Sequence, residues 1–183
     1  MINKALEQSL VRAIQEAKTR AHQFVTVEHM LYGLLADELA TYIISECGGS
    51  VDTLKKRLET FLETKIPKTP SAVKEDPAQT VAFNRVLQRA LNHVKSCGKK
   101  EADAGDILVA MFSERDSHAV YFLNSLGLNR MAVVNFISHE LPEGLQQEPL
   151  SSPPPQPEPG TQEGNSATEL EKYTINLTSS AAE

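Results

Sequence analysis

Residues 6–21 read LEQSLVRAIQEAKTRA, and residues 83–98 read FNRVLQRALNHVKSCG. Apolar side chains stand at the same places in both stretches, 77 residues apart, with the i, i+4, i+7, i+8, i+11 spacing of one helix face. The matched positions are Leu6 with Phe83, Leu10 with Leu87, Ala13 with Ala90, Ile14 with Leu91 and Ala17 with Val94. Two helices with one pattern indicate that the chain carries two copies of a larger unit.

The duplication extends over residues 6–62 and 83–139. The separation is 77 at Leu31 and Leu108, increases to 79 at Tyr42 and Tyr121 through an insertion near Asp116, and returns to 77 at Leu54 and Met131. A repeat of this size favours a paired scaffold with a groove between its halves over an enzyme built around one cleft.

Each copy is expected to hold four helices. In the first copy, Thr26 is the expected N-cap of the second helix, and Glu28 lies in the first turn, where the helix dipole favours a carboxylate. Val25 and Met30 fit a hydrophobic staple around this helix start. Gly48 is expected to end the third helix in the left-handed conformation.

The second copy repeats this plan, with Asp103 in place of Thr26 and Gly127 in place of Gly48. No segment shows sustained period-two alternation with β-branched residues, so no strands are expected. The predicted fold class is therefore all-α, with two pseudo-twofold-related four-helix repeats and about eight helices in total.

Three kinds of segment follow from this pattern. Repeat one spans residues 1–64, a proline-containing connection spans 65–78, and repeat two spans 79–141, which together make one duplicated domain. Residues 142–168 are expected to form a disordered, flexible linker, because seven of the ten prolines lie at 142–159 and apolar residues are few. Residues 169–183 regain some apolar pattern but are too short to fold alone.

The charge is unevenly placed. Residues 1–141 hold 17 Lys/Arg and 17 Asp/Glu, whereas residues 142–183 hold one Lys and seven Asp/Glu, which accounts for the net charge of −6. A neutral domain with an acidic tail argues against nucleic-acid binding. The acidic tail is interpreted as a solvated spacer rather than an interaction arm.

No apolar run reaches the roughly 18 residues of a membrane span. The N-terminus does not resemble a secretory signal, and two cysteines give no disulfide framework, so a cytoplasmic protein is expected.

The sequence contains none of the common catalytic motifs. The sequence lacks GxxxxGK[ST], GxGxxG, HExxH, CxxC and GxSxG, so no enzymatic activity, cofactor or metal is expected in this chain. Cys47 and Cys97 are interpreted as small packed side chains. His22 and His93 lie near the ends of equivalent helices, where a surface zinc site is an alternative to incidental surface histidines. His29 beside Glu28 suggests a helix start more than a general base.

Three stretches carry a family resemblance. Residues 26–35, TVEHMLYGLL, are similar to the Thr-x-Glu-His-aliphatic-Leu-x-x-Leu-Leu signature in the N-terminal domains of Clp-type AAA+ unfoldases. Residues 83–90, FNRVLQRA, are similar to the start of that family's second repeat, and residues 133–139, VVNFISH, resemble its ClpA type. The resemblance covers about residues 1–140. Further on, residues 173–177, YTINL, are similar to the entry of the first ATPase module.

The resemblance implies an adaptor- and substrate-docking domain that does not itself hydrolyse ATP. In the family this domain lies above a hexameric ring, and in the ClpA type it receives a ClpS-type adaptor that delivers N-degron proteins to a ClpP-type peptidase. Residues 169–183 would then be the truncated start of an ATPase module. ATP and magnesium would belong to such modules of a longer, hexameric parent, and this chain alone would be monomeric.

The resemblance also implies a partner surface, at positions that match the family's adaptor contacts. These residues are Gln23, Glu28, Thr80, Arg85 and Arg130. Gln23 stands where the family usually has an acidic residue. A structural alternative exists for the others: Glu28 as a first-turn carboxylate, Thr80 as the cap of the fifth helix, and Arg85 and Arg130 as solvated charges. ClpC-type domains bind phospho-arginine through an acidic residue in both copies. Here the position in repeat two that is equivalent to Glu28 is Gly105, which argues against a symmetric phospho-arginine site.

A second hypothesis of a different class is a helical-repeat protein that binds exposed apolar peptides directly in the groove between its copies, as a chaperone does. A third, a small enzyme, has no support in the motif search.

Overall fold

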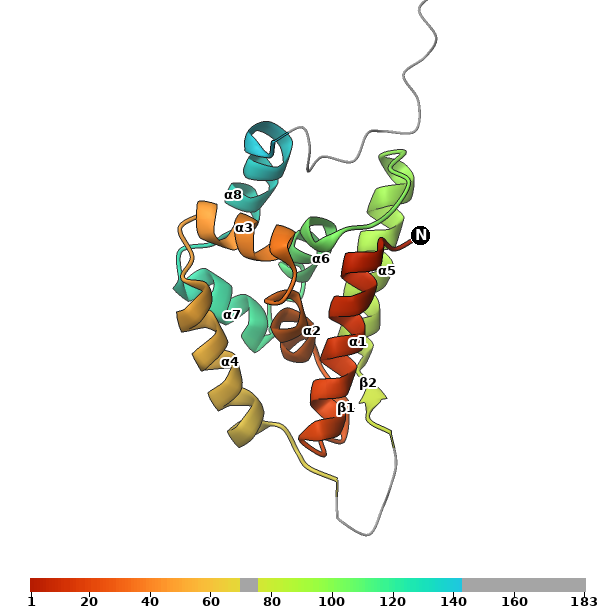
Figure 1. Cartoon of the computed structure of the whole chain (residues 1–183), viewed down its shortest axis with the longest axis vertical. Helices are drawn as coiled ribbons and strands as arrows, with labels where there is room; N and C mark the ends of the chain where they lie inside the picture. Colours follow the sequence, from red (N-terminus) through yellow and green to blue (C-terminus); the bar gives the residue numbers. More distant parts are fainter. Residues whose placement is uncertain (70–75, 143–183) are drawn as a thin grey trace, which may run out of the picture. The chain divides into compact units, whose positions relative to one another are not determined.

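Four helices make up the first repeat and four more the second, in the computed structural model that describes residues 1–69 and 76–142 (Figure 1). The first repeat holds α1 (Lys4–Thr19), β1 (Phe24–Val25), α2 (Val27–Leu34), α3 (Glu38–Glu46) and α4 (Val51–Lys65). The second holds β2 (Ala78–Gln79), α5 (Val81–Ser96), α6 (Ala104–Met111), α7 (His118–Ser125), α8 (Arg130–Asn135) and the π-helical turn η1 (Phe136–Glu140). The all-α fold class is confirmed. Most of the predicted linker and all of residues 169–183 lie outside the described residues.

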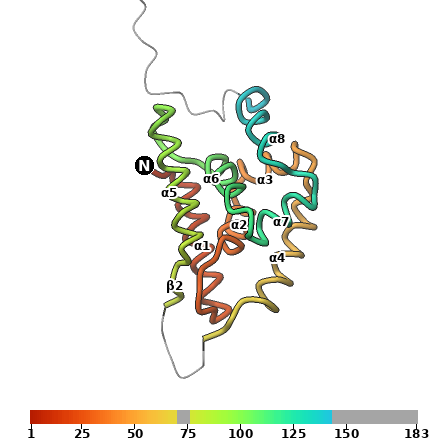
Figure 2. Tube along the Cα trace, turned by 180° about the vertical axis from the view of Figure 1, so that it is seen from behind, coloured from red at the N-terminus to blue at the C-terminus, as the bar shows by residue number. Residues whose placement is uncertain are grey.

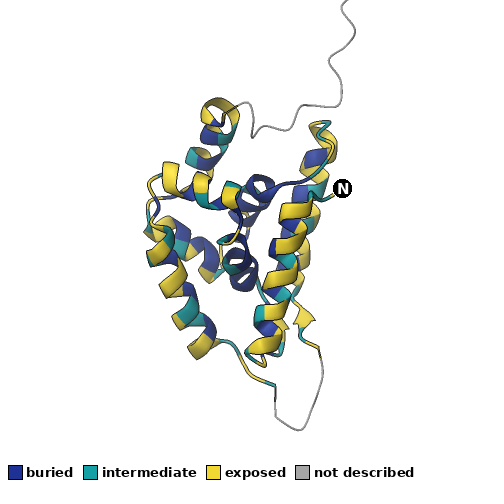
Figure 3. Cartoon of the chain, viewed as in Figure 1, coloured by how far each residue is buried: buried dark blue, intermediate teal, exposed yellow. Residues whose placement is uncertain are grey.

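The two short helices α2 and α6 occupy the centre of the core. Figure 3 shows both helices almost wholly buried, while the long helices around them expose one face. α1 packs on α2, α5 packs on α6, and α4 contacts both α2 and α7. The approach of α1 to α2 is close at Gly33, where a Cβ atom would come within 2.3 Å of the Ser9 carbonyl oxygen. Any larger residue at this position would push the two helices apart.

Side-chain and glycine caps set the helix boundaries. Thr26 and Asp103 are the N-caps of α2 and α6, as the sequence predicts. Gly48 and Gly127 follow the third helix of each repeat, and both have a φ angle of +86°, the left-handed conformation predicted for them. The same turn chemistry therefore ends equivalent helices in both repeats.

The expectation of no strands is wrong for two short segments. β1 and β2 pair in parallel, with Phe24 opposite Ala78 and Val25 opposite Gln79. Segments of two residues are too short to show period-two alternation, so the sequence pattern could not reveal them. Their pairing joins the start of α2 in repeat one to the start of α5 in repeat two.

The same contact occurs a second time with the repeats exchanged. Ile2 forms a parallel bridge with Ala102, and these residues are 77 positions away from Gln79 and Val25 respectively. Its backbone bond from Asn3 N to Ala102 O, 2.9 Å, repeats the bond from Thr80 N to Val25 O, 3.0 Å. This exchange is direct evidence for pseudo-twofold symmetry, because each repeat supplies the edge on which the other's first helix begins.

Candidate functional site

Two of the predicted partner-binding residues flank the β1–β2 pair. Gln23 precedes β1 and is half-buried; its backbone N–H donates to Pro67 O at 3.0 Å, and its carbonyl accepts from Ala78 N at 3.0 Å. Its side-chain amide donates to Lys68 O at 3.2 Å. Thr80 follows β2. Gln23 and Thr80 thus lie at the two ends of one small structural unit.

Thr80 caps α5, which confirms its structural alternative. Its hydroxyl oxygen accepts from Phe83 N at 3.2 Å and lies 3.2 Å from Val25 O, to which the hydroxyl donates. The side chain therefore fixes both the start of α5 and the end of β1.

Arg85, one turn further along α5, forms a two-pronged ion pair with Glu114. Its Nε is 2.8 Å from Glu114 Oε1 and its Nη2 is 2.6 Å from Oε2, while Arg89 contacts Oε1 as well. The hydrogen bond from Arg85, together with Arg89, holds the pKa of Glu114 below its ordinary value. The Glu114 side chain is 8% exposed but that of Arg85 is 51% exposed, so a partner can still reach the guanidinium.

Glu28 is not the exposed carboxylate that a docking surface beside Arg85 would need. It is 6% exposed, and its Oε1 accepts from Ala119 N at 3.2 Å. This bond crosses from repeat one to the first turn of α7 in repeat two, so the carboxylate acts as a helix cap supplied from another element. The sequence identified Glu28 as a first-turn residue of its own helix, and it could not show which other helix the side chain would reach.

Arg130 is exposed at the first position of α8, as its solvated-charge alternative requires. In Figures 1 and 2, α8 and β2 lie at opposite ends of the long axis of the described unit. The structure therefore brings Gln23, Thr80 and Arg85 to one end and leaves Arg130 at the other. The five residues do not form a single continuous patch.

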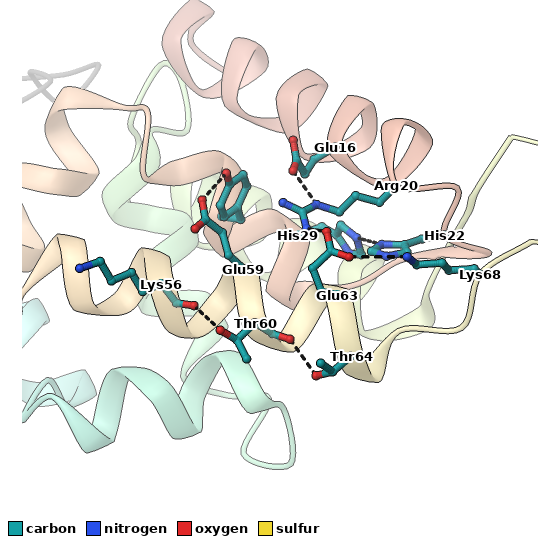
Figure 4. A network of polar contacts seen from close by, with 11 residues as sticks. Glu16, Arg20, His22, His29, Lys56, Glu59, Thr60, Glu63, Thr64 and Lys68 are labelled. Atoms are coloured by element: carbon teal, nitrogen blue, oxygen red, sulfur yellow. Dashed lines mark hydrogen bonds and ion pairs between the residues drawn. The ribbon is translucent and has the colours of Figure 1, made fainter.

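Sequence reasoning missed a buried histidine pair at the start of α2 (Figure 4). Nδ1 of His29 accepts from Thr26 N at 3.1 Å, and its Nε2 lies 2.8 Å from Nδ1 of His22. Both rings are buried, at 1% exposure for His22 and 0% for His29, so the expectation of a surface histidine is wrong for His22. Burial, followed by the nearby His22 and Arg20, lowers the pKa of His29 to about 3, which keeps the ring neutral.

The equivalent positions in repeat two carry charges. Lys99 and Asp106 are 77 residues beyond His22 and His29, and Lys99 Nζ lies 2.8 Å from Asp106 Oδ2 and 3.0 Å from Asp103 Oδ2. Asp106 Oδ2 accepts from Asp103 N at 3.0 Å, as His29 does from Thr26. A motif search by residue type could not detect this match, because only the 77-residue separation relates the two sets.

The cysteines and His93 form no site. Cys47 is half-buried, and burial followed by Glu140 and Glu46 raises the pKa of its thiol. Cys97 is exposed, which contradicts its predicted packing, and its Sγ is 3.6 Å from His93 Nε2.

Within residues 1–69 and 76–142, no group of three or more His, Cys, Asp or Glu side chains could hold a metal ion. Within the same ranges, no helix has the length and apolar character needed to span a membrane.

The surface hollows of the described residues include two that could hold a ligand or a peptide. One, of about 890 Å³, lies between α1 and the segment that joins α2 to α3, with charges of both signs around it. The other, of about 590 Å³, lies between α4 and α7, and therefore between the two repeats. Its lining residues are Lys56, Arg57, Thr60, Phe61, Thr64, Lys65, Tyr121, Phe122 and Ser125.

Comparison with known families assigns this fold. The family described as "Clp repeat (R) N-terminal domain" matches residues 1–126. The chain belongs to this family, whose domains occur in Clp-type ATPases. A ClpA homolog protein from Fuscovulum blasticum is 34% identical over 181 residues, which is 96% of this chain and 23% of that protein. A ClpA homolog described as an ATP-dependent Clp protease ATP-binding subunit, from Trieres chinensis, is 26% identical over 92% of this chain and 19% of that protein.

The chain thus spans about a fifth of the length of these curated relatives. Among solved structures, the Hsp104 N-terminal domain from Candida albicans has a TM-score of 0.68 at 14% identity, over 80% of this chain and 93% of that one. The ClpV N-domain in complex with a VipB peptide has a TM-score of 0.61 at 23% identity, over 75% of this chain and 85% of that one. At these identities the structures establish the fold.

Proposed function

We propose that this chain is the adaptor- and substrate-docking domain of a ClpA-like unfoldase, that it binds a ClpS-type adaptor, and that its parent delivers substrates to a ClpP-type peptidase. The observation that carries the proposal is the similarity to the ClpA homolog, which extends over 96% of this chain and continues past the folded repeats. A protein complex is also known for one structural neighbour, the ClpV N-domain with its VipB peptide. In this proposal the chain carries no active site, and ATP and magnesium bind elsewhere in a hexameric, cytoplasmic parent.

The adaptor surface in this proposal is the end of the molecule around β1, β2 and the first turns of α5. Arg85 supplies an accessible cation on α5, and Gln23 supplies an amide next to β1. Thr80 orients both by holding β1 against α5. Glu28 contributes by positioning α7, and Arg130 offers a separate exposed cation at the other end. Polar contacts of this kind suit a modest interface that must form and release repeatedly.

A calorimetric titration of the 183-residue chain with a ClpS-type adaptor from the same source tests the proposal. A saturable one-to-one isotherm is the expected result, and Arg85→Glu should weaken it by roughly tenfold or more because it reverses an accessible charge. Arg89→Glu is the matched control, since Arg89 shares Glu114 with Arg85. Equal losses for both variants would assign the effect to the shared ion pair rather than to the adaptor contact. An absence of heat and of complex at micromolar concentrations would contradict the adaptor role.

A further inference from the structure

The groove between α4 and α7 is lined by three aromatic rings and three cations, and by no carboxylate. Phe61 comes from α4, and Tyr121 and Phe122 come from α7. The ring centroids of Phe61 and Phe122 are 5.8 Å apart, as are those of Tyr121 and Phe122. Tyr121 is 64% exposed, although its ring has apolar faces on which a ligand can pack. The two repeats thus form an open aromatic surface where they meet.

Two of the three acidic residues of α4 point away from the groove. Glu59 and Glu63 face the first repeat, where Glu59 Oε1 accepts from Tyr32 Oη at 3.1 Å and Glu63 pairs with Arg20 (Figure 4). The third, Asp52, is exposed in the first turn of the helix, and Lys55 lies on the side of Tyr32. The exposed cations Lys56, Arg57 and Lys65 line the groove instead. No Asp or Glu lies within α7 or among the residues that line the groove.

The hydroxyl groups inside the groove are already engaged. The Thr60 hydroxyl donates to Lys56 O at 3.0 Å, and the Thr64 hydroxyl donates to Thr60 O at 2.7 Å. Arg57 Nη1 donates to Ser125 Oγ at 2.5 Å, which holds one cation across the groove from α4 to α7. The groove therefore offers positive charge and aromatic surface, while its threonine hydroxyls donate to backbone acceptors of their own helix. A ligand that fits it needs negative charge and an apolar side chain rather than a specific hydrogen-bond pattern.

The duplication does not explain this chemistry. The counterparts of Lys56, Arg57 and Phe61, 77 residues further on, are Val133, Val134 and Ser138. The equivalent helix α8 is six residues long, whereas α4 has fifteen, so repeat two has no comparable wall. The cations and the aromatic residue therefore arose in one repeat only, which separates them from the features that both repeats need in order to fold.

We propose that the α4–α7 groove docks an acidic peptide segment of a protein partner, one that carries an aromatic or large aliphatic side chain between its carboxylates. Because the groove is lined by cations, charge complementarity requires a negatively charged partner. The exposed aromatic rings form the surface on which the partner's apolar side chain packs. The groove is distinct from the proposed adaptor surface around β1 and β2, so the two proposals stand or fall separately.

Fluorescence anisotropy with the 183-residue chain and a labelled peptide of sequence EDELFEDLE tests this proposal. Saturable binding is expected, and it should weaken as salt increases. The double reversal Lys56→Glu with Arg57→Glu should raise the dissociation constant by roughly tenfold or more, and Tyr121→Ala by roughly fivefold. All three side chains are exposed, and a thermal melt verifies that each variant folds.

Lys55→Glu is the matched control, because Lys55 neighbours Lys56 on the same helix but lies beside a different hollow, next to Glu16 and Tyr32. This variant should change the dissociation constant by less than about twofold. Equal losses for Lys55→Glu and the double reversal, equal binding of the basic peptide KRKLFKRLK, or no binding of the acidic peptide would each overturn the proposal. Self-association of the chain that the double reversal abolishes would assign the groove to a second copy and overturn it too.

Discussion

The starts of α2 and α6 make the same hydrogen bonds with different chemistry. At the start of α2, a neutral ring on His29 accepts from the N-cap backbone and contacts the neutral ring of His22. At the start of α6, the carboxylate of Asp106 accepts from the N-cap backbone and pairs with the cation of Lys99. Duplication therefore preserved the positions of donor and acceptor but not the residue types.

A comparison of the starts of α2 and α6 shows what the fold requires at both positions. The N-cap N–H needs an acceptor three residues on, and that acceptor needs a partner from the turn before the helix. An uncharged pair and an ion pair both meet these needs in a buried place. They differ in how they respond to acid, because burial disfavours the proton that either histidine would take up, whereas burial favours protonation of Asp106.

The largest expected effect tests whether the two repeats contribute equally to the core. Leu31 in α2 is 0% exposed and Leu108 in α6 is 1% exposed, and they are 77 residues apart. Replacing either with alanine removes buried methyl groups and leaves a cavity, so each variant should lose roughly 2–5 kcal/mol of unfolding free energy. Urea denaturation measures both losses. Values below about 1 kcal/mol at both positions would show that the two helices are not the centre of the core.

Acid should have opposite effects on the stability contributed by the two helix starts. The pKa of His29 in the fold is about 3, below the ordinary value of 6.5, so only the unfolded chain takes up this proton as pH falls from 6.5 towards 3. The contribution of His29 to the free energy of unfolding therefore decreases over this window, by on the order of 3 kcal/mol between pH 7 and pH 4. Asp106 has the opposite sign: burial and Asp103 raise its pKa above 3.8, so the fold binds this proton first and acid favours the fold.

Urea titrations at pH 7 and pH 4 check the acid prediction with a matched pair of variants. His29→Asn keeps an acceptor and should flatten the pH dependence, whereas Asp106→Asn should make it steeper, because it removes the opposing contribution. The same pH dependence in wild type and in His29→Asn would contradict the assignment of the buried neutral ring.

A smaller effect is expected for the caps of the third helix in each repeat. Asp37 Oδ1 accepts from both Leu39 N and Ala40 N in α3, whereas α7 divides the task between Ser117 and Glu28. Glu28→Ala should cost about 1–2 kcal/mol because Ala119 N loses its acceptor. Glu28→Gln retains an oxygen and should cost about half of that or less. Thermal melts measure both losses, and an unchanged midpoint for Glu28→Ala would contradict the cap.

The smallest effect should be equal in the two repeats. Gly48 and Gly127 share a φ angle of +86°, and a Cβ atom at either position would meet nothing within 4 Å. Alanine therefore adds backbone strain without a clash, at about 1 kcal/mol for each glycine. Urea denaturation of Gly48→Ala and Gly127→Ala compares them, and costs that differ by more than about 1 kcal/mol would show that the two turns have diverged.

The sequence predicts the repeated helices well because their causes are local. The 77-residue register, the caps Thr26 and Asp103 and the turn glycines are visible in residue types alone. The β1–β2 pair is not predictable in this way, because two-residue strands form through pairing between distant segments. The partner of Glu28 is hidden for the same reason, since Ala119 is 91 residues away.

The candidate site shows the same limit. Residue matching selects Gln23, Thr80, Arg85 and Arg130, but only the fold reveals that α8, which begins with Arg130, lies at the opposite end of the described unit from β2. The groove between α4 and α7 could be expected in general from the duplication. Its cations and aromatic rings could not be, because which side of α4 each charge occupies depends on contacts with Tyr32 and Arg20.

The exchanged bridges, Val25 with Gln79 and Ala102 with Ile2, bear on how such a domain can originate. A single repeat carries both halves of this contact, one before its first helix and one before its second. Two copies of such a half-chain present these halves to each other in one register, as in a homodimer with twofold symmetry. Joining the copies through residues 65–78 makes their association independent of protein concentration. It also frees each half to change its side chains separately, as α4 and the two helix starts have done.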